Sequence, residues 1–218
     1  MESINDIDQS RYFTELAAAF VRGRLGIEGD FTPEELIELG RAKELRLHKF
    51  KRNTELPRVK KVLGILQALS PASLLDIGSG RGTFLWPLLD AFPHLQITAI
   101  DVSEQRVSDI NAVRLGGIAN LRALQMDAAA IALEDGNVDV VTALEVLEHL
   151  PESLLAAAEA IRVARNFVVA SVPSKEDDNP EHIQLFTRAS FEQLWLTAGA
   201  RSVKVDFVLN HMIAVAKV

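Results

Sequence analysis

The spacing of apolar and polar positions changes near residue 70 of the chain. From there on, short apolar runs of strand length alternate with segments whose apolar residues recur every three to four positions, the spacing of one helix face. Helices are predicted from Ser103 through Val113, over 152–163 and over 189–198. The runs predicted as strands are SLLDIG (73–78), QITAID (96–101), LRALQMD (121–127), VDVVTAL (138–144), NFVVASV (166–172), SVKVDFV (202–208) and HMIAVAKV (211–218).

This alternation predicts an α/β fold. Strands interleaved with helices form a mostly parallel sheet that helices cover on both faces. Asn210 occupies a short turn between the last two runs, which predicts an antiparallel C-terminal hairpin. We therefore expect a doubly wound, seven-stranded sheet over residues 71–218. Such sheets bind ligands beyond the carboxyl ends of their strands, where the strand order reverses.

The first 70 residues read as helical instead, in about three pieces. Thr32 followed by Pro33 and two glutamates is a typical helix start. Apolar residues from Val59 to Leu69 form one stripe after Pro57. The segment is too short and too polar to form a core alone, so residues 1–70 are predicted to be a cap or lid packed on the sheet domain.

Composition narrows the classes of protein. The chain has 218 residues and is 48% hydrophobic, enough for one globular core. It has no cysteine, which excludes disulfides and thiolate metal sites. The N-terminus lacks a signal-peptide pattern and no apolar stretch approaches 18 residues, so a cytoplasmic protein without membrane spans is expected.

Charge is unevenly distributed along the chain. Residues 41–61 hold nine Lys or Arg and two Glu, a local charge of +7, within a chain whose formal net charge is −7. The acidic remainder argues against a general nucleic-acid binder. The basic segment is interpreted as a solvated helix face, although it leaves room for one anionic ligand.

Three glycines, Gly78, Gly80 and Gly82, alternate with other residues directly after the first predicted strand. Glycine at such a density indicates a sharp turn or a close approach to a ligand. The spacing does not fit the dinucleotide loop, whose third glycine would replace Thr83, and no Lys follows as in a P-loop. Asp76, two residues before the first glycine, is unfavourable beside pyrophosphate and suits a ligand with a positive end.

The stretch DIGSGRG resembles the first motif of the class I S-adenosylmethionine-dependent methyltransferases, acidic-x-G-x-G-x-G. The resemblance implies that Asp76 lies near the methionine end of the cofactor. It also implies that Asp101 accepts from the ribose hydroxyls and Asp127 from the adenine amino group, with Val102 and Met126 beside the adenine ring. The cofactor-binding residues predicted in this way are Asp76, Gly78, Ser79, Gly80, Asp101, Val102, Met126, Asp127, Ala128 and Glu145.

Candidate catalytic residues follow the fourth and fifth strands. Glu145, Glu148 and His149 would share one face if ALEVLEHLPE formed a helical turn there. His182, in PEHIQLFTRASF, lies at the same rim and could face His149. We predict His149, His182 and Glu148 as catalytic, with one histidine taking the proton of an acceptor hydroxyl. This interpretation assigns no metal.

Two resemblances lead to different acceptors. EVLEH and the later histidine resemble the ubiquinone-biosynthesis O-methyltransferases, which implies O-methylation of a small organic molecule, the leading prediction. They also resemble the metal-dependent enzymes that methylate the terminal ribose 2′-hydroxyl of small RNAs. That resemblance implies a divalent ion held by Glu145, Glu148, His149 and His182, with RNA phosphates along residues 41–61.

A non-catalytic subunit that binds the cofactor or activates a partner is the third alternative. Pocket shape decides the acceptor, and no motif encodes shape. The sequence therefore leaves open the acceptor molecule, its reacting atom and whether the chain is a monomer or a homodimer.

Overall fold

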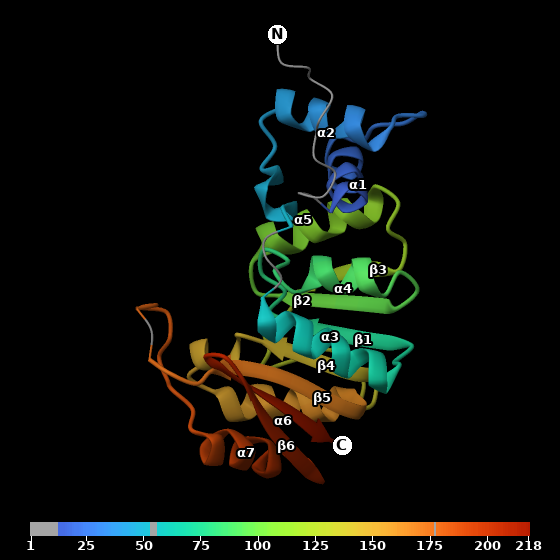
Figure 1. Ribbon diagram of the computed structural model, residues 1–218. Helices are drawn as coiled ribbons and strands as arrows, with labels where there is room; N and C mark the ends of the chain where they lie inside the picture. Colours follow the sequence, from blue (N-terminus) through green and yellow to red (C-terminus); the bar gives the residue numbers. More distant parts are fainter. Residues whose placement is uncertain (1–12, 53–55, 177) are drawn as a thin grey trace.

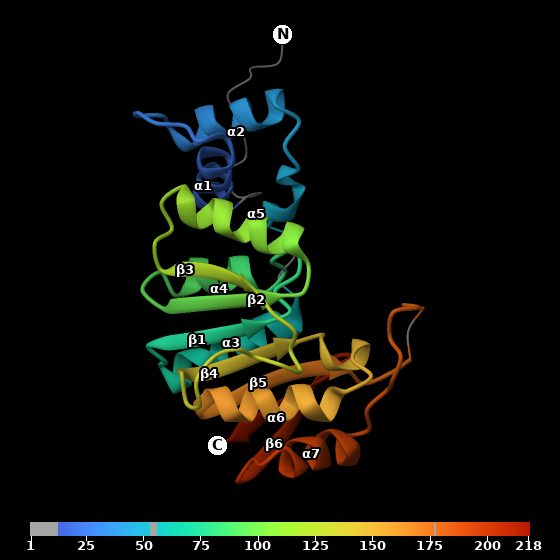
Figure 2. The same ribbon diagram turned by 180° about the vertical axis from the view of Figure 1, so that it is seen from behind.

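The computed structural model describes residues 13–52, 56–176 and 178–218, which form a sheet between layers of helices (Figures 1 and 2). The strands are β1 (Ser73–Ile77), β2 (Gln96–Asp101), β3 (Leu121–Gln125), β4 (Val138–Leu144), β5 (Ala164–Pro173), β6 (Ser202–Val208) and β7 (His211–Lys217). The helices are α1 (Thr14–Leu25), α2 (Pro33–Ala42), α3 (Pro57–Leu69), α4 (Leu85–Ala91), α5 (Glu104–Leu115), α6 (Ser153–Val163) and α7 (Arg188–Thr197), with short 3₁₀ turns η2 (Leu47–Phe50) and η3 (Leu147–His149).

The sheet has the predicted topology. Its strand order is β3-β2-β1-β4-β5-β7-β6, so the order reverses between β1 and β4. Strands β1 to β5 pair in parallel, and β7 pairs antiparallel with both β5 and β6. The predicted doubly wound fold with a closing hairpin is confirmed. The carboxyl ends of β1 and β4 flank the crevice where ligands bind in such sheets.

Side-chain alternation along the strands divides the interior into two cores. Leu74 belongs to a core that contains buried residues of α3, α4 and α5, whereas its neighbour Leu75 belongs to a core with α6 and α7. Successive residues of a strand point to opposite faces of the sheet. Because both faces are covered, β1 is buried from Leu74 to Ile77.

Local signals in the sequence set several helix boundaries. Thr32 forms the capping box that its spacing to Glu35 indicates, and the Ser103 hydroxyl accepts from the Arg106 amide at the start of α5. Pro87 is the third residue of α4, which begins only at Leu85. Pro87 therefore lies in the first turn of the helix, where a backbone nitrogen has no intrahelical partner to lose.

The N-terminal helices extend the first core beyond the sheet. Helix α1 packs against α5 and α2 packs against α1, at the far end of the molecule from β6 (Figure 1). Phe20, Ile37 and Phe50 share one core with Trp86 of α4. Residues 1–12 of the predicted cap lie outside the described residues, and its role as a lid stays a prediction. None of the described helices has the length and apolar character needed to cross a membrane.

Two glycines let α1 and α5 touch through their backbones. A Cβ at Gly23 would lie 1.9 Å from the carbonyl oxygen of Ala112, and a Cβ at Gly116 would lie 1.8 Å from that of Ala19. Neither backbone oxygen can move as a side chain would. The packing of α1 on the sheet domain therefore requires these small residues.

We expect Gly116→Ala to lower the free energy of unfolding by about 1–3 kcal/mol, the usual cost of overpacking. The new methyl group would force α1 away from α5. Gly64→Ala is the matched control, because Gly64 is exposed on α3 and a Cβ placed there would meet no heavy atom within 4 Å. That substitution should raise stability by roughly 0.5–1 kcal/mol through helix propensity. Urea unfolding measures both, and a Gly116→Ala protein as stable as the wild type would contradict the close contact.

Candidate active site

The loop after β1 runs through left-handed backbone at all three of its glycines, with φ values of 68°, 56° and 84° at Gly78, Gly80 and Gly82. A Cβ at Gly78 would lie 2.6 Å from Val146, and one at Gly82 would lie 2.0 Å from Trp86. A Cβ at Gly80 would have the Gly78 carbonyl oxygen as its nearest neighbour, 3.7 Å away. Protein packing thus accounts for two of the glycines, whereas Gly80 faces open space that a ligand can fill.

Asp76 lies beneath this loop with 2% of its surface exposed. The Ser79 hydroxyl donates to its Oδ2 at 2.6 Å and the Thr142 hydroxyl donates to its Oδ1 at 2.8 Å. Burial raises the pKa of Asp76 to about 6, the nearby Asp101 carboxylate adds to the rise, and the two hydroxyls oppose it. The carboxylate is therefore costly to ionise on its own, and a positive ligand would offset that cost.

Asp101 ends β2 and ties the loop to α5. Its Oδ2 accepts from the Gly80 amide at 2.9 Å and its Oδ1 accepts from the Ser103 amide at 2.9 Å. Arg106 approaches Oδ2 at 3.4 Å. The sequence prediction did not include Arg106. Its position five residues after Asp101, in the first turn of α5, is the only local signal that could have indicated it.

Two cavities meet at Gly78, Gly80 and Glu145, along the carboxyl edge of the sheet. The smaller, of about 160 Å³, also contains Asp76 and Arg58 in its lining. The larger, of about 450 Å³, extends past Asp101 to the loop after β3. Every residue predicted to bind a cofactor lines one cavity or the other: Asp76, Gly78, Ser79, Gly80, Asp101, Val102, Met126, Asp127, Ala128 and Glu145.

Glu145 has an unusual backbone and three partners. Its φ is 57°, a left-handed conformation that costs a long side chain about 1–2 kcal/mol. The carboxylate accepts from the Ser171 hydroxyl at 2.8 Å and pairs with His211 Nε2 at 3.1 Å and Arg58 Nε at 3.8 Å. Burial raises the pKa of Glu145, but the His211 hydrogen bond and the Arg58 charge outweigh it and hold the pKa below its usual range.

The sequence prediction missed all three of these partners. Arg58 lies in α3, Ser171 in β5 and His211 at the first position of β7, so they come from segments distant in sequence. None belongs to a motif that singles it out. Only the pairing of β5 with β7, which sets Pro173 opposite His211, brings the last strand to this edge.

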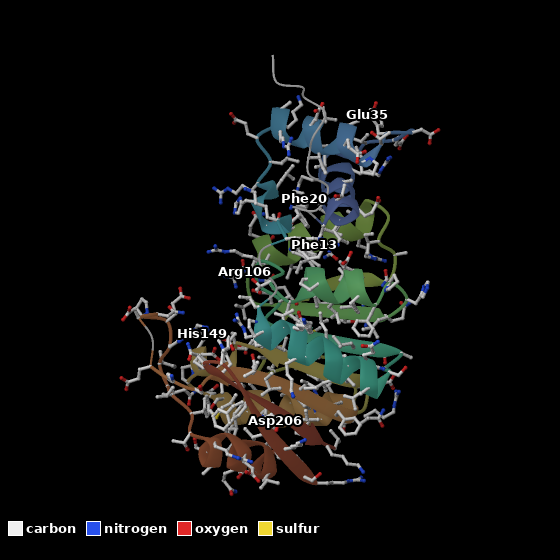
Figure 3. The ribbon with its side chains drawn as sticks, viewed as in Figure 1. Phe13, Phe20, Glu35, Arg106, His149 and Asp206 are labelled. Atoms are coloured by element: carbon white, nitrogen blue, oxygen red, sulfur yellow. The ribbon has the colours of Figure 1, made fainter. Side chains whose placement is uncertain are left out.

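The predicted catalytic residues gather beside the larger cavity. One ligand atom from each of Glu148, His149 and His182 lies within 4.8 Å of the others, and the two imidazole rings are 4.8 Å apart between centroids. His149 Nδ1 lies 2.9 Å from the Glu181 carbonyl oxygen. Because a carbonyl only accepts, Nδ1 carries the proton and Nε2 is left as the acceptor or ligand atom. His149 and Arg106 lie along the same edge of the molecule (Figure 3).

Glu145 does not join this cluster, contrary to the expected helical turn. Its positive φ is incompatible with a right-handed helical turn, and η3 begins only at Leu147 and ends at His149. The side chain turns toward Ser171 and His211 instead. The predicted set of four metal-ligand candidates is therefore wrong in one member, because backbone conformation rather than i, i+3 spacing decides which side chains converge.

The basic segment is divided among several partners. Lys49 pairs with Asp109, Arg52 with Asp90 at 2.8 Å, and Lys61 with Asp206 at 3.6 Å. Residues 53–55 of the segment lie outside the described residues. Arg58, which also belongs to this segment, lines the smaller cavity.

Comparisons with known proteins agree with this geometry. The family model described as methyltransferase domain matches residues 75–168. A ubiquinone biosynthesis O-methyltransferase of Cupriavidus pinatubonensis is 32% identical over 114 residues, which are 49% of this chain and 44% of that protein. A malonyl-(acyl-carrier protein) O-methyltransferase of Methylococcus capsulatus is 27% identical over 150 residues, or 62% and 54% of the two chains. The chain thus spans about half the length of these relatives.

A solved structure shows the same fold. The crystal structure of a SAM dependent methyltransferase from Aquifex aeolicus superposes with a TM-score of 0.60 at 22% identity, covering 86% of this chain and 99% of that one. A likeness at this level of identity establishes the architecture of the chain.

We expect Asp76→Asn to stabilise the ligand-free protein in a pH-dependent way. The native pKa of about 6 exceeds the ordinary value of 3.8, so the contribution of Asp76 to wild-type stability falls as pH rises from about 4 to about 6. Above pH 6 the full penalty of about 3 kcal/mol is present. The advantage of Asn over Asp should therefore grow across that window and then stay constant, as urea unfolding at each pH would measure.

Asp139→Asn is the matched control with the opposite sign. Burial raises the pKa of Asp139, but the amides of Ala72 and Ser73 outweigh it and hold the pKa below its usual value. Its stabilising effect is present above about pH 4 and is lost as pH falls. Asp139→Asn should therefore be less stable than the wild type at neutral pH, and the difference should shrink in acid. Curves that run parallel for the two variants would contradict at least one of the two assignments.

Proposed function

We propose that this chain, a member of the class I S-adenosylmethionine-dependent methyltransferase family, transfers a methyl group to a hydroxyl of a small organic molecule. The observation that carries the proposal is the pair of cavities joined at Gly80, with a buried carboxylate at Asp76 in one and at Asp101 in the other. The relatives named as O-methyltransferases support oxygen as the reacting atom. The acidic net charge favours a small molecule over RNA.

The donor set fits S-adenosylmethionine. The ammonium and sulfonium groups at its methionine end carry positive charge, which suits the smaller cavity with Asp76 and Glu145. The larger cavity offers Asp101 to the ribose hydroxyls, and Met126 and Asp127 to the adenine. Gly80, with no side chain and open space beside it, lets the backbone pass close beneath the ligand.

Methyl transfer from a sulfonium requires mainly alignment. The bound cofactor supplies an activated methyl group, so the protein has to hold the acceptor oxygen in line with the methyl carbon and sulfur. The acceptor proton must also leave, and a neutral imidazole near the rim can take it. The sequence predicts that His149 or His182 accepts this proton, and Glu148 lies beside them.

The N-terminal segment contributes one wall of the proposed site. Arg58 and Val59, in the first turn of α3, line the smaller cavity. We propose that part of residues 1–70 covers the acceptor once the cofactor is bound, as lids do in many enzymes.

One observation favours a second candidate function. Glu148, His149 and His182 offer one oxygen and two nitrogens, a donor set that suits a borderline divalent ion. A metal there would polarise a ribose hydroxyl, as in the RNA 2′-O-methyltransferases that the sequence resembles. This alternative rests on the convergence of these three side chains, of which Glu148 is 1% exposed.

Purified protein should bind S-adenosylhomocysteine, the product form of the cofactor, but not NAD. At ten to a hundred times its dissociation constant, the ligand should stabilise the fold by roughly 1.4–2.7 kcal/mol. Asp101→Asn should weaken binding by about 1.5–3 kcal/mol, the range for a hydrogen bond to a charged group. Asp135→Asn is the control, since Asp135 pairs with Arg162 and its side chain is 82% exposed. Calorimetry decides, and unchanged affinity in Asp101→Asn would assign the ribose elsewhere.

Metal removal separates the two candidate functions. With catechol as a trial phenolic acceptor, the leading proposal predicts that dialysis against EDTA leaves the methyltransferase rate within about twofold. If the metal alternative is right, EDTA should abolish methylation of a short RNA, and manganese or magnesium should restore it. The His182→Asn variant would then lose metal binding in calorimetry, whereas His94→Asn, altered in an exposed loop, would not.

A further inference from the structure

His211 occupies a position that the proposed function leaves without a role. It opens β7, opposite Pro173 of β5, at the edge where both cavities lie. Its Nε2 lies 3.1 Å from Glu145, and Glu145 lines both cavities. The Glu145 side chain therefore lies between the imidazole and the place where the two cavities meet.

Glu145 is held so that its carboxylate faces this imidazole. The Ser171 hydroxyl donates to Oε1 and Arg58 approaches the same oxygen, which leaves Oε2 to His211. The side chains of Arg58, Glu145 and His211 are 18–23% exposed, so each is partly open to solvent. A left-handed backbone at Glu145 is maintained by these contacts, and such strained residues cluster at functional sites.

The pairing fixes which ring nitrogen carries the proton. A carboxylate only accepts, so Nε2 of His211 donates to Glu145 and Nδ1 of the neutral ring has a free lone pair. Among the residues that the structure describes, none forms a hydrogen bond with Nδ1 of His211. A histidine oriented by a carboxylate through one nitrogen and open at the other is the arrangement of a general base.

The other histidines are less well placed for the methyl-transfer end. His149 lines the larger cavity, together with the residues assigned to ribose and adenine, but not the smaller one. Neither His182 nor His211 lines either cavity, but His211 pairs with Glu145, which lines both, whereas His182 lies beside His149 at the larger cavity. Glu145 lines the smaller cavity with Asp76, where the methionine end is placed, and His211 is bonded to Glu145.

We propose that His211, oriented by Glu145, is the base that takes the proton from the acceptor hydroxyl. The assignment rests on the proposed function and differs from the sequence prediction in the residue that accepts the proton. Nδ1 removes the hydroxyl proton while an oxygen lone pair forms the bond to the methyl carbon. The carbon–sulfur bond breaks, and its electron pair stays on sulfur as the neutral thioether. The imidazolium then releases its proton to water.

The first experiment compares two acceptors of different acidity. His211→Asn should lower kcat on catechol about 10²–10⁴-fold, the range for loss of a general base. The loss should shrink to a few-fold on 4-nitrocatechol, whose hydroxyl is largely ionised at neutral pH and needs no base. The dissociation constant for S-adenosylhomocysteine should stay within about twofold. His94→Asn, in an exposed loop before β2, is the matched control and should behave as wild type.

Equal losses on both catechols would overturn the proposal, because a purely structural role does not distinguish acceptors by acidity. So would an unchanged rate in His211→Asn, or a larger acceptor-dependent loss in His149→Asn or His182→Asn.

The second experiment needs neither an acceptor nor a variant. Long-range ¹H–¹⁵N spectra of the wild-type protein with S-adenosylhomocysteine report the tautomer of each imidazole. His211 should be in the Nε2–H form when neutral, and an Nδ1–H form would overturn the proposal. If the wild type binds S-adenosylhomocysteine but methylates neither catechol, catechols are not its acceptors, and the tautomer alone decides the assignment of His211.

Discussion

The hydrogen bonds between the glycine loop and the end of β2 hold the candidate site together. The Gly78 amide donates to the Ile100 carbonyl at 2.8 Å, and the Gly80 amide donates to the Asp101 carboxylate at 2.9 Å. These bonds require left-handed backbone, which only glycine adopts at little cost. The loop therefore turns away from β1 at once and leaves the crevice between β1 and β4 open.

Two carboxylates near this loop differ in how well the protein stabilises their charge. Asp76 is buried with two hydroxyl donors and no cation among the described side chains, so its ionised form is destabilised. Glu145, just beyond the end of β4, receives His211 and Arg58 and is stabilised as an anion. A ligand with positive charge would complete the environment of the first carboxylate, whereas the second is already satisfied and can act on its own partners. The same edge therefore holds one carboxylate suited to binding and one suited to orienting a histidine.

The N-terminal helices are joined to the sheet domain by close packing. Backbone contact at Gly23 and Gly116 fixes α1 on α5, and Phe50 packs against Trp86 at 4.9 Å between ring centroids. Trp86 also fills the space beside Gly82. Packing of the N-terminal segment and the shape of the glycine loop thus share one indole ring, which links the stability of the first helices to the geometry of the site.

The sequence by itself determined the sheet, the glycine loop and the row of acidic residues at its edge. These features depend on local signals: apolar runs of strand length, glycine spacing, and Asp76 and Asp101 at fixed offsets from strand ends. The predicted cofactor-binding residues line the two cavities because parallel strands end at a common edge, so position in the motif dictates position in space.

Tertiary structure alone decided which side chains meet around Glu145. Arg58 and His211 lie 87 residues before and 66 residues after it in the sequence, and no spacing rule connects them. Their meeting depends on where α3 packs and on the pairing of β7 with β5, and the left-handed turn at Glu145 then directs its carboxylate toward them and away from Glu148.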